Sequence, residues 1–122
     1  MSDTRWPTQI HLKNQGKNLE ITFDDGLEVS FTSEFLRVMS PSAEVQGHTP
    51  DQRKVIAGKQ DTTIIGVDPV GNYAVKLTFD DLHDTGIFTW TYFQEMNDQK
   101  EFLWNRYLSE LQDRGLSRDL SK

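Results

Sequence analysis

The chain has no cysteine among its 122 residues, which excludes disulfide bonds, thiolate nucleophiles and cysteine-ligated metal centres. It also lacks any apolar run near the roughly 20 residues that a membrane-spanning helix needs. No apolar segment follows the single arginine close to the N-terminus, so we expect no secretory signal. These absences predict a cytoplasmic protein without membrane contact.

Basic residues are scarce: 13 Lys and Arg stand against 19 Asp and Glu, for a net charge of −6. Such a surface repels phosphate backbones, and the basic residues are diluted by polar or acidic neighbours, so we expect no nucleic-acid partner. The length fits one domain over residues 1–122. We expect a core over about 7–113 and a flexible tail over 114–122.

Alternation of apolar and polar residues predicts strands over 8–14, 18–23 and 27–31, with a hairpin at Asp25-Gly26. A short helix is predicted over 32–39, capped by Thr32 or Ser33. Pro41 lacks a backbone N–H and disfavours helix in the residue before it, so the helix should end there.

Residues 42–61 are predicted to be mostly loop, with a short strand near 54–56, and two further strands follow over 62–70 and 72–79. Residues 86–88 resume an extended or helix-entry segment. The remainder is predicted to form helices over 89–97 and 98–115, the second capped by Asp98 with Glu101 in a capping box. This order predicts an α+β fold: an antiparallel β-sheet, a short helix after the third strand, and C-terminal helices packed on the sheet.

The segment LRVMSPSAEVQGH is a polar interruption with two interpretations. In the functional one, Arg37 binds a carboxylate, and Glu44 and His48 serve as acid, base or ligand. In the structural one, Arg37 pairs locally with a carboxylate, while Ser40 and Ser42 satisfy backbone groups of the loop. No spacing of a known catalytic set occurs here, so the structural interpretation is favoured.

A second cluster, DDLHD, surrounds His83 with aspartates. Histidine with carboxylates is half of a plausible metal site, yet a structural metal usually needs about four ligands. The favoured interpretation is an acidic turn after a strand. Whether His48 and His83 converge is left open at this stage. No G-x-S-x-G, P-loop, G-x-G-x-x-G or H-E-x-x-H motif occurs.

The blocks LRVMSPSAEVQGH, PVGNYAVKLTFDDLHDTGIFTWTYF and FLWNRYLSELQDRGLSRD resemble the bacterial family called domain of unknown function 971. This is the same domain as the N-terminal module of gamma-butyrobetaine hydroxylase and trimethyllysine hydroxylase. The resemblance runs from about Gln9 to Asp119 and implies an α+β fold rich in antiparallel strands. The oxygenase domain of those hydroxylases does not fit within 122 residues, so hydroxylation is not implied.

The resemblance also implies where a zinc site of three cysteines and one histidine would lie. The cysteine positions correspond to Ser40, Ser42 and Val45, and the histidine to His83. Two serines and a valine cannot replace three thiolates, so we expect no zinc of this type and no other cofactor. A further departure is Leu82, where relatives of this family generally have glycine.

The leading hypothesis is a non-catalytic binding or adaptor domain that contacts a protein. Its candidate contact residues are Arg37, Ser40, Ser42, Glu44 and His48. A related domain is fused to scaffolds for iron–sulfur cluster assembly, which suggests, by analogy only, a link to iron–sulfur or metalloenzyme maturation.

The alternative hypothesis is a metal-binding domain that uses His83 with His48 or nearby carboxylates. A third, less favoured, is a small-molecule enzyme that uses Arg37, Glu44 and His48.

Overall fold

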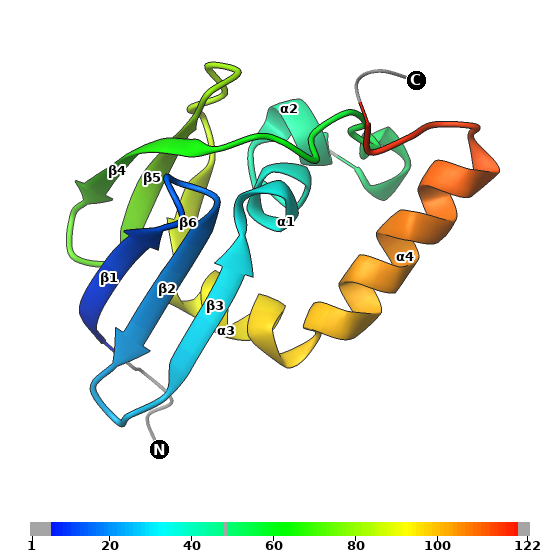
Figure 1. Ribbon diagram of the computed structural model, residues 1–122. Helices are drawn as coiled ribbons and strands as arrows, with labels where there is room; N and C mark the ends of the chain where they lie inside the picture. The colour runs from blue at the N-terminus through cyan, green and yellow to red at the C-terminus, as the bar shows by residue number, and fades with distance from the viewer. Residues whose placement is uncertain (1–5, 48, 120–122) are drawn as a thin grey trace.

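The computed structural model describes residues 6–47 and 49–119, and Figure 1 shows their arrangement. In chain order the elements are β1 (Pro7–Lys13), β2 (Asn18–Phe23), β3 (Glu28–Thr32), α1 (Ser33–Val38), α2 (Ala43–Gln46), the 3-10 turn η1 (Pro50–Gln52), β4 (Ile64–Val70), β5 (Ala74–Phe79), β6 (Ile87–Thr89), α3 (Trp90–Asp98) and α4 (Lys100–Asp113).

The predicted α+β class is confirmed, with the short helix after the third strand and the helices at the C-terminal end. The strands, however, divide between two antiparallel sheets, of order β1-β2-β3 and β4-β5-β6. The turn between β1 and β2 links the sheets, because the carbonyl of Gly16 accepts a hydrogen bond from the N–H of Ile64 at 2.8 Å. Gly16 has a φ of +88° and no space for a Cβ against Ile64.

Both sheets and the helices contribute to one hydrophobic core. The inward positions of β2 and β3 alternate with polar ones, as the sequence predicts. Phe93 of α3 joins the sheets, since its ring lies 5.8 Å from that of Phe31 in β3 and 5.6 Å from that of Phe88 in β6. Trp104 of α4 packs on Phe35 of α1, with the ring centroids 6.3 Å apart.

Helix starts show where local sequence signals hold and where they fail. The predicted cap of α1 is confirmed, because Thr32 Oγ1 accepts a hydrogen bond from the Phe35 N–H at 3.0 Å. The predicted capping box of α4 is wrong. Asp98 is the last residue of α3, and Gln99 occupies the N-cap without a side-chain hydrogen bond.

The segment predicted to be mostly loop, 42–61, contains α2 and η1, which the sequence analysis did not predict. The strand predicted at 54–56 is wrong. This segment packs against α4 instead of pairing in a sheet, and the carbonyl of Ile56 accepts a hydrogen bond from Tyr107 Oη at 2.5 Å. One backbone hydrogen bond joins this segment to α2: the Lys54 N–H donates to the Val45 carbonyl.

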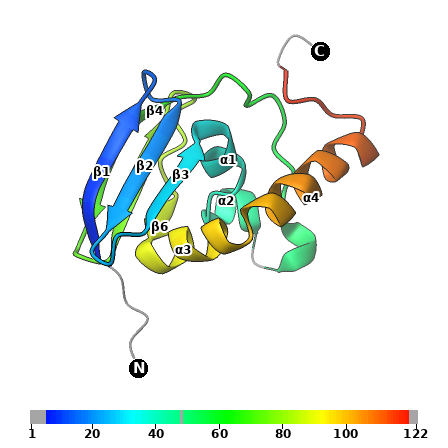
Figure 2. The ribbon, with the colours of Figure 1, turned by 60° about the horizontal axis from the view of Figure 1, so that its bottom comes forward.

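Figures 1 and 2 show α1 and α2 lying between the sheets on one side and α4 on the other. After α4 the chain returns to the connector before β4: the N–H groups of Gly58 and Gln60 donate to the carbonyls of Ser117 and Arg118 at 2.8 and 3.0 Å. The sequence did not predict these contacts. Over the described ranges, no helix is both long and apolar enough to cross a membrane.

Candidate functional site

The candidate site is built around the turn between β5 and β6, residues 80–85, which we call the Leu82 turn. Leu82 has a φ of +71° and is 77% exposed. For a residue with a Cβ, this left-handed conformation costs about 1–2 kcal/mol. Such a conformation persists only where the surroundings impose it. The contacts of Asp81 and His83, on either side of Leu82, show how they do so.

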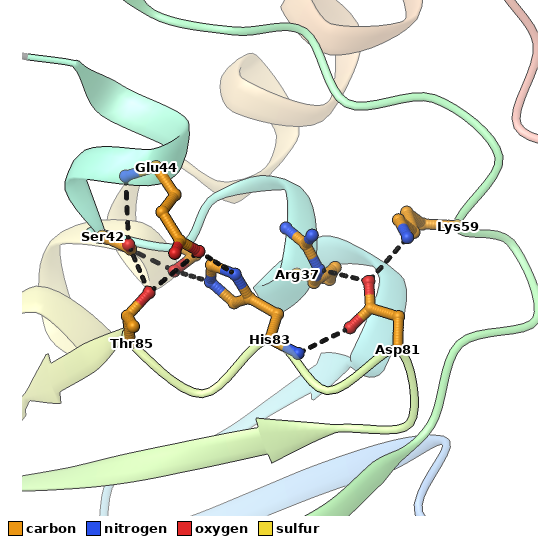
Figure 3. A network of polar contacts seen from close by, with 8 residues as sticks. Arg37, Ser42, Glu44, Lys59, Asp81, His83 and Thr85 are labelled. Atoms are coloured by element: carbon orange, nitrogen blue, oxygen red, sulfur yellow. Dashed lines mark hydrogen bonds and ion pairs between the residues drawn. The ribbon is translucent and has the colours of Figure 1, made fainter.

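Asp81 ties the turn to two distant segments (Figure 3). Its Oδ2 accepts hydrogen bonds from Arg37 Nε at 2.8 Å and from Lys59 Nζ at 2.6 Å, and its Oδ1 accepts from the His83 N–H at 3.1 Å. Burial raises the pKa of Asp81, but the bonds from Lys59, His83 and Arg37 outweigh burial and hold the pKa well below its usual range. The carboxylate is therefore charged except in strong acid.

His83 fixes the other side of the turn through both ring nitrogens, and its side chain is only 4% exposed. Nε2 lies 2.9 Å from Ser40 Oγ, and Nδ1 lies 3.0 Å from Glu44 Oε1. Burial lowers the pKa of His83, and the positive charge of Arg37 lowers it further, against the opposite effects of Glu44 and Asp81. The partners fit a neutral imidazole that donates from Nδ1 to Glu44 and accepts at Nε2 from Ser40.

Ser42 and Thr85 connect α2 to the end of the turn. Ser42 Oγ caps α2 by accepting from the Glu44 N–H at 3.1 Å and lies 2.6 Å from Thr85 Oγ1. Thr85 Oγ1 in turn donates to Glu44 Oε1 at 3.1 Å. The hydroxyl of Ser42 can therefore donate to Thr85, so that every hydroxyl of this chain of bonds has an acceptor.

Ser40, His83 and Glu44 have the connectivity of a serine–histidine–acid triad. The Ser40 residue is, however, 0% exposed, and its Oγ also accepts from the Ser42 N–H at 3.3 Å. A Cβ on Gly86 would lie 2.4 Å from this oxygen, which shows how closely the chain covers it. A nucleophile must approach its substrate to about 3 Å, and this hydroxyl faces the protein interior. The three residues hold the turn to α1 and α2.

The structure brings together most of the residues that the sequence singled out: Arg37, Ser40, Ser42, Glu44 and His83 belong to connected parts of one polar network (Figure 3). Arg37 pairs with a carboxylate, as the structural interpretation expects, but the pair is not local, because its partner Asp81 is 44 residues away. His48 lies outside the described residues, and so does the open question of whether it converges with His83.

Sequence reasoning missed three contributors. Lys59 is 22 residues from Asp81, and no sequence signal connects the two. Thr85 directly follows the DDLHD cluster, so a search for hydroxyls beside that histidine would have found it. Leu82 was noted only as a departure from glycine, and its positive φ explains why glycine suits this position.

The metal hypothesis requires a free ring nitrogen on His83, but both nitrogens already have partners, Ser40 and Glu44. Among residues 6–47 and 49–119, no three or more His, Asp or Glu side chains are grouped to hold a metal ion. Of the cysteine positions implied by the resemblance, Ser40 touches His83 directly, Ser42 is joined to it through Thr85 and Glu44, and Val45 is buried in α2.

The chain belongs to the family of gamma-butyrobetaine hydroxylase-like N-terminal domains, whose sequence profile matches residues 10–94. The matched range contains the whole Leu82 turn together with α1 and α2. The predicted family is thereby confirmed. The match concerns an N-terminal domain, so it carries no hydroxylase activity to this chain. No match is found among curated proteins.

Three solved structures are similar to this chain, two of them over nearly its whole length. Two solution structures determined by NMR share 46% and 42% identity with it, at TM-scores of 0.79 and 0.82. They cover 94% and 97% of this chain, and 90% and 88% of their own lengths. The third is a crystal structure of a protein of unknown function from Acidithiobacillus ferrooxidans, described as a member of the DUF971 family. It has 35% identity and a TM-score of 0.62, and covers 75% of this chain and 91% of its own.

Proposed function

We propose that this domain is a non-catalytic adaptor that contacts another protein through the Leu82 turn. The observation that carries the proposal is a large apolar residue, 77% exposed, on a strained backbone that ion pairs and a buried histidine hold in place. Strained residues cluster where a structure presents a group for recognition. An apolar side chain on a rigid support loses little entropy on binding, which favours association.

The surroundings of Leu82 suggest the chemistry of the partner. The carboxylate of Glu44 is 63% exposed and Asp84 is exposed too, within a protein of net charge −6. A complementary surface would offer an apolar pocket for Leu82 and basic residues at its rim. Arg37, Ser40 and Ser42 act in this proposal by supporting the turn, not by touching the partner.

The test is capture from the native cell extract with a photo-crosslinking amino acid at position 82. Partners recovered in this way should be lost when purified Leu82→Ala or Leu82→Gly protein replaces the wild type in an ordinary pull-down. Phe102→Ala is the matched control, because Phe102 is also exposed but lies on α4. If the same proteins bind both Leu82 variants as well as they bind the wild type, the proposal fails.

Two finer points belong to the same proposal. The first is that the protein and its partner are cytoplasmic, and fractionation of cells would test this location. A link to iron–sulfur or metalloenzyme maturation rests on the fusion partners of a related domain. It gains support only if the crosslinked proteins include an assembly factor or a metalloenzyme.

The alternative, a metal site at His83, is favoured by one contact: Nδ1 and the Glu44 carboxylate already lie 3.0 Å apart. A metal ion would have to displace this hydrogen bond or the one from Ser40. Untagged wild type and His83→Gln, analysed for bound metal, distinguish the two proposals. Stoichiometric metal in the wild type that is lost in the variant would support the metal site.

A further inference from the structure

A second feature of the domain, separate from the Leu82 turn, is a buried carboxylate in the first turn of α1. The Glu34 side chain is 6% exposed. Burial of a charged carboxylate is costly unless a cation with good geometry accompanies it. The cation here is Arg118, whose Nε and Nη2 donate to the two carboxylate oxygens at 2.8 and 2.7 Å. The pair is therefore bidentate.

The face of Trp104 completes the surroundings of this guanidinium. The Arg118 guanidinium carbon lies 5.2 Å from the centroid of a Trp104 ring, within the range of a cation–π contact. A planar fork that meets both oxygens of a carboxylate and also stacks on an aromatic face matches arginine and not lysine. Glu34 and Trp104 thus form a cradle specific for an arginine side chain, which we call the Glu34–Trp104 cleft.

Space flanks the ion pair on both sides. One hollow of about 510 Å³ reaches from Glu34 past Phe35 and Trp104 to Lys100 of α4. Another of about 350 Å³ reaches from Glu34 to Asp61 before β4. Glu34 and Arg118 line both hollows, so the ion pair stands at their common boundary. Residues adjoining an arginine in this position would have room on either side.

The arginine that fills the cradle belongs to the segment after α4. Its side chain is 38% exposed, against 6% for its carboxylate partner. Besides the ion pair, the backbone of this segment is joined to the connector before β4 by the bonds from Gly58 and Gln60 to Ser117 and Arg118. The carboxylate and the tryptophan lie on helices, whereas the cation belongs to a short stretch of irregular chain.

We propose that the Glu34–Trp104 cleft is a binding site for an arginine side chain of a partner protein. Arg118 fills the site in cis and competes with that arginine. The site is preformed because both of its walls are helical and its carboxylate is already desolvated, so an incoming arginine replaces one cation with another. The segment that carries Arg118 therefore weakens the binding of arginine-containing segments of a partner and is displaced by them.

The experiment uses the full chain and the capped amino acid N-acetyl-arginine amide as the probe. Arg118→Ala leaves the cradle without its guanidinium and should bind the probe at least about tenfold more tightly than the wild type does. N-acetyl-lysine amide should bind Arg118→Ala about tenfold more weakly than the arginine probe. Binding is followed by calorimetry in every variant and, where Trp104 is present, also through the NMR signal of its indole N–H, and circular dichroism checks that each variant is folded.

Removal of either wall is the control. Arg118→Ala combined with Glu34→Gln should lose probe binding at least about tenfold, and Arg118→Ala combined with Trp104→Leu serves the same purpose if the first does not fold. Equal affinity of Arg118→Ala and wild type, or equal affinity for the two probes, overturns the proposal. Tighter binding of free L-arginine than of the capped probe overturns the assignment to a protein segment. These results do not depend on the Leu82 turn, so the two proposals fail separately.

Discussion

Leu82 occupies a left-handed backbone conformation that glycine adopts without steric cost. Leu82→Gly should therefore raise the free energy of unfolding by up to about 1 kcal/mol, the strain of about 1–2 kcal/mol being partly offset by the greater chain entropy of unfolded glycine. Denaturation by urea measures the change. Leu82→Ala is the matched control, because it removes the exposed side chain but keeps the strain. A stability gain in the alanine variant as large as in the glycine variant would contradict this account.

Ser40, Ser42 and Val45 stand where the resemblance places three zinc-binding cysteines around His83. Replacement of all three by cysteine should create a site that binds about one zinc ion per chain, because three thiolates and one imidazole form a complete tetrahedral set. Metal analysis after dialysis measures the stoichiometry. The same triple variant with His83→Gln should bind zinc more weakly. If the triple variant retains no more zinc than the wild type, the correspondence of the positions is wrong.

At the scale of elements, the contact between the β1–β2 turn and β4 holds the two sheets together. Gly16 combines a φ of +88° with a Cβ position only 2.4 Å from the Ile64 carbonyl oxygen. Gly16→Ala should lower the free energy of unfolding by about 2–5 kcal/mol. Backbone strain contributes part of this loss, and the rest comes from a clash that neither sheet can relieve without moving. Thermal unfolding, monitored by circular dichroism, checks this.

Gly26 is the matched position for this substitution. Its φ is +89°, but nothing lies within 4 Å of its Cβ position. Gly26→Ala should therefore cost only about 1 kcal/mol, the part that arises from the backbone alone. Equal losses at the two glycines would show that the added Cβ at position 16 meets no costly clash with Ile64.

Strands and caps were predictable where the signal is local. The strand predicted over 18–23 is β2, and the Thr32 cap needs only the residues beside it. The failures have non-local causes. α2 has only four residues, which are too few to show a helical period. The segment 54–56 has the composition of a strand but finds α4 as its neighbour instead of another strand.

At the scale of the whole molecule, stability should depend on pH through His83. Its pKa is lowered in the folded protein by burial first and by Arg37 second. As the pH falls through about 6.5, His83 in the unfolded chain takes up a proton that the folded state resists. The unfolded state then binds more protons, so the free energy of unfolding falls on acidification.

The measurement is urea denaturation at several pH values between about 5 and 7.5. The wild type should lose more stability over this range than His83→Gln does. Asp81 does not interfere, because its lowered pKa contributes stability that is lost only below about pH 4. His11 and His48 are present in both proteins, so their effects cancel in the comparison. Parallel curves for the two proteins would contradict the role given to His83.

By itself the sequence determined the α+β class, the family and the polar character of residues 36–48, because periodicity, caps and motifs are properties of neighbours along the chain. Only the tertiary structure decided what those polar residues do. Arg37 and Asp81 are 44 residues apart, and Glu34 and Arg118 are 84 apart. Charge attraction depends on distance in space and not on distance along the chain. The tertiary fold therefore determines these ion pairs, and through them the Leu82 turn and the Glu34–Trp104 cleft.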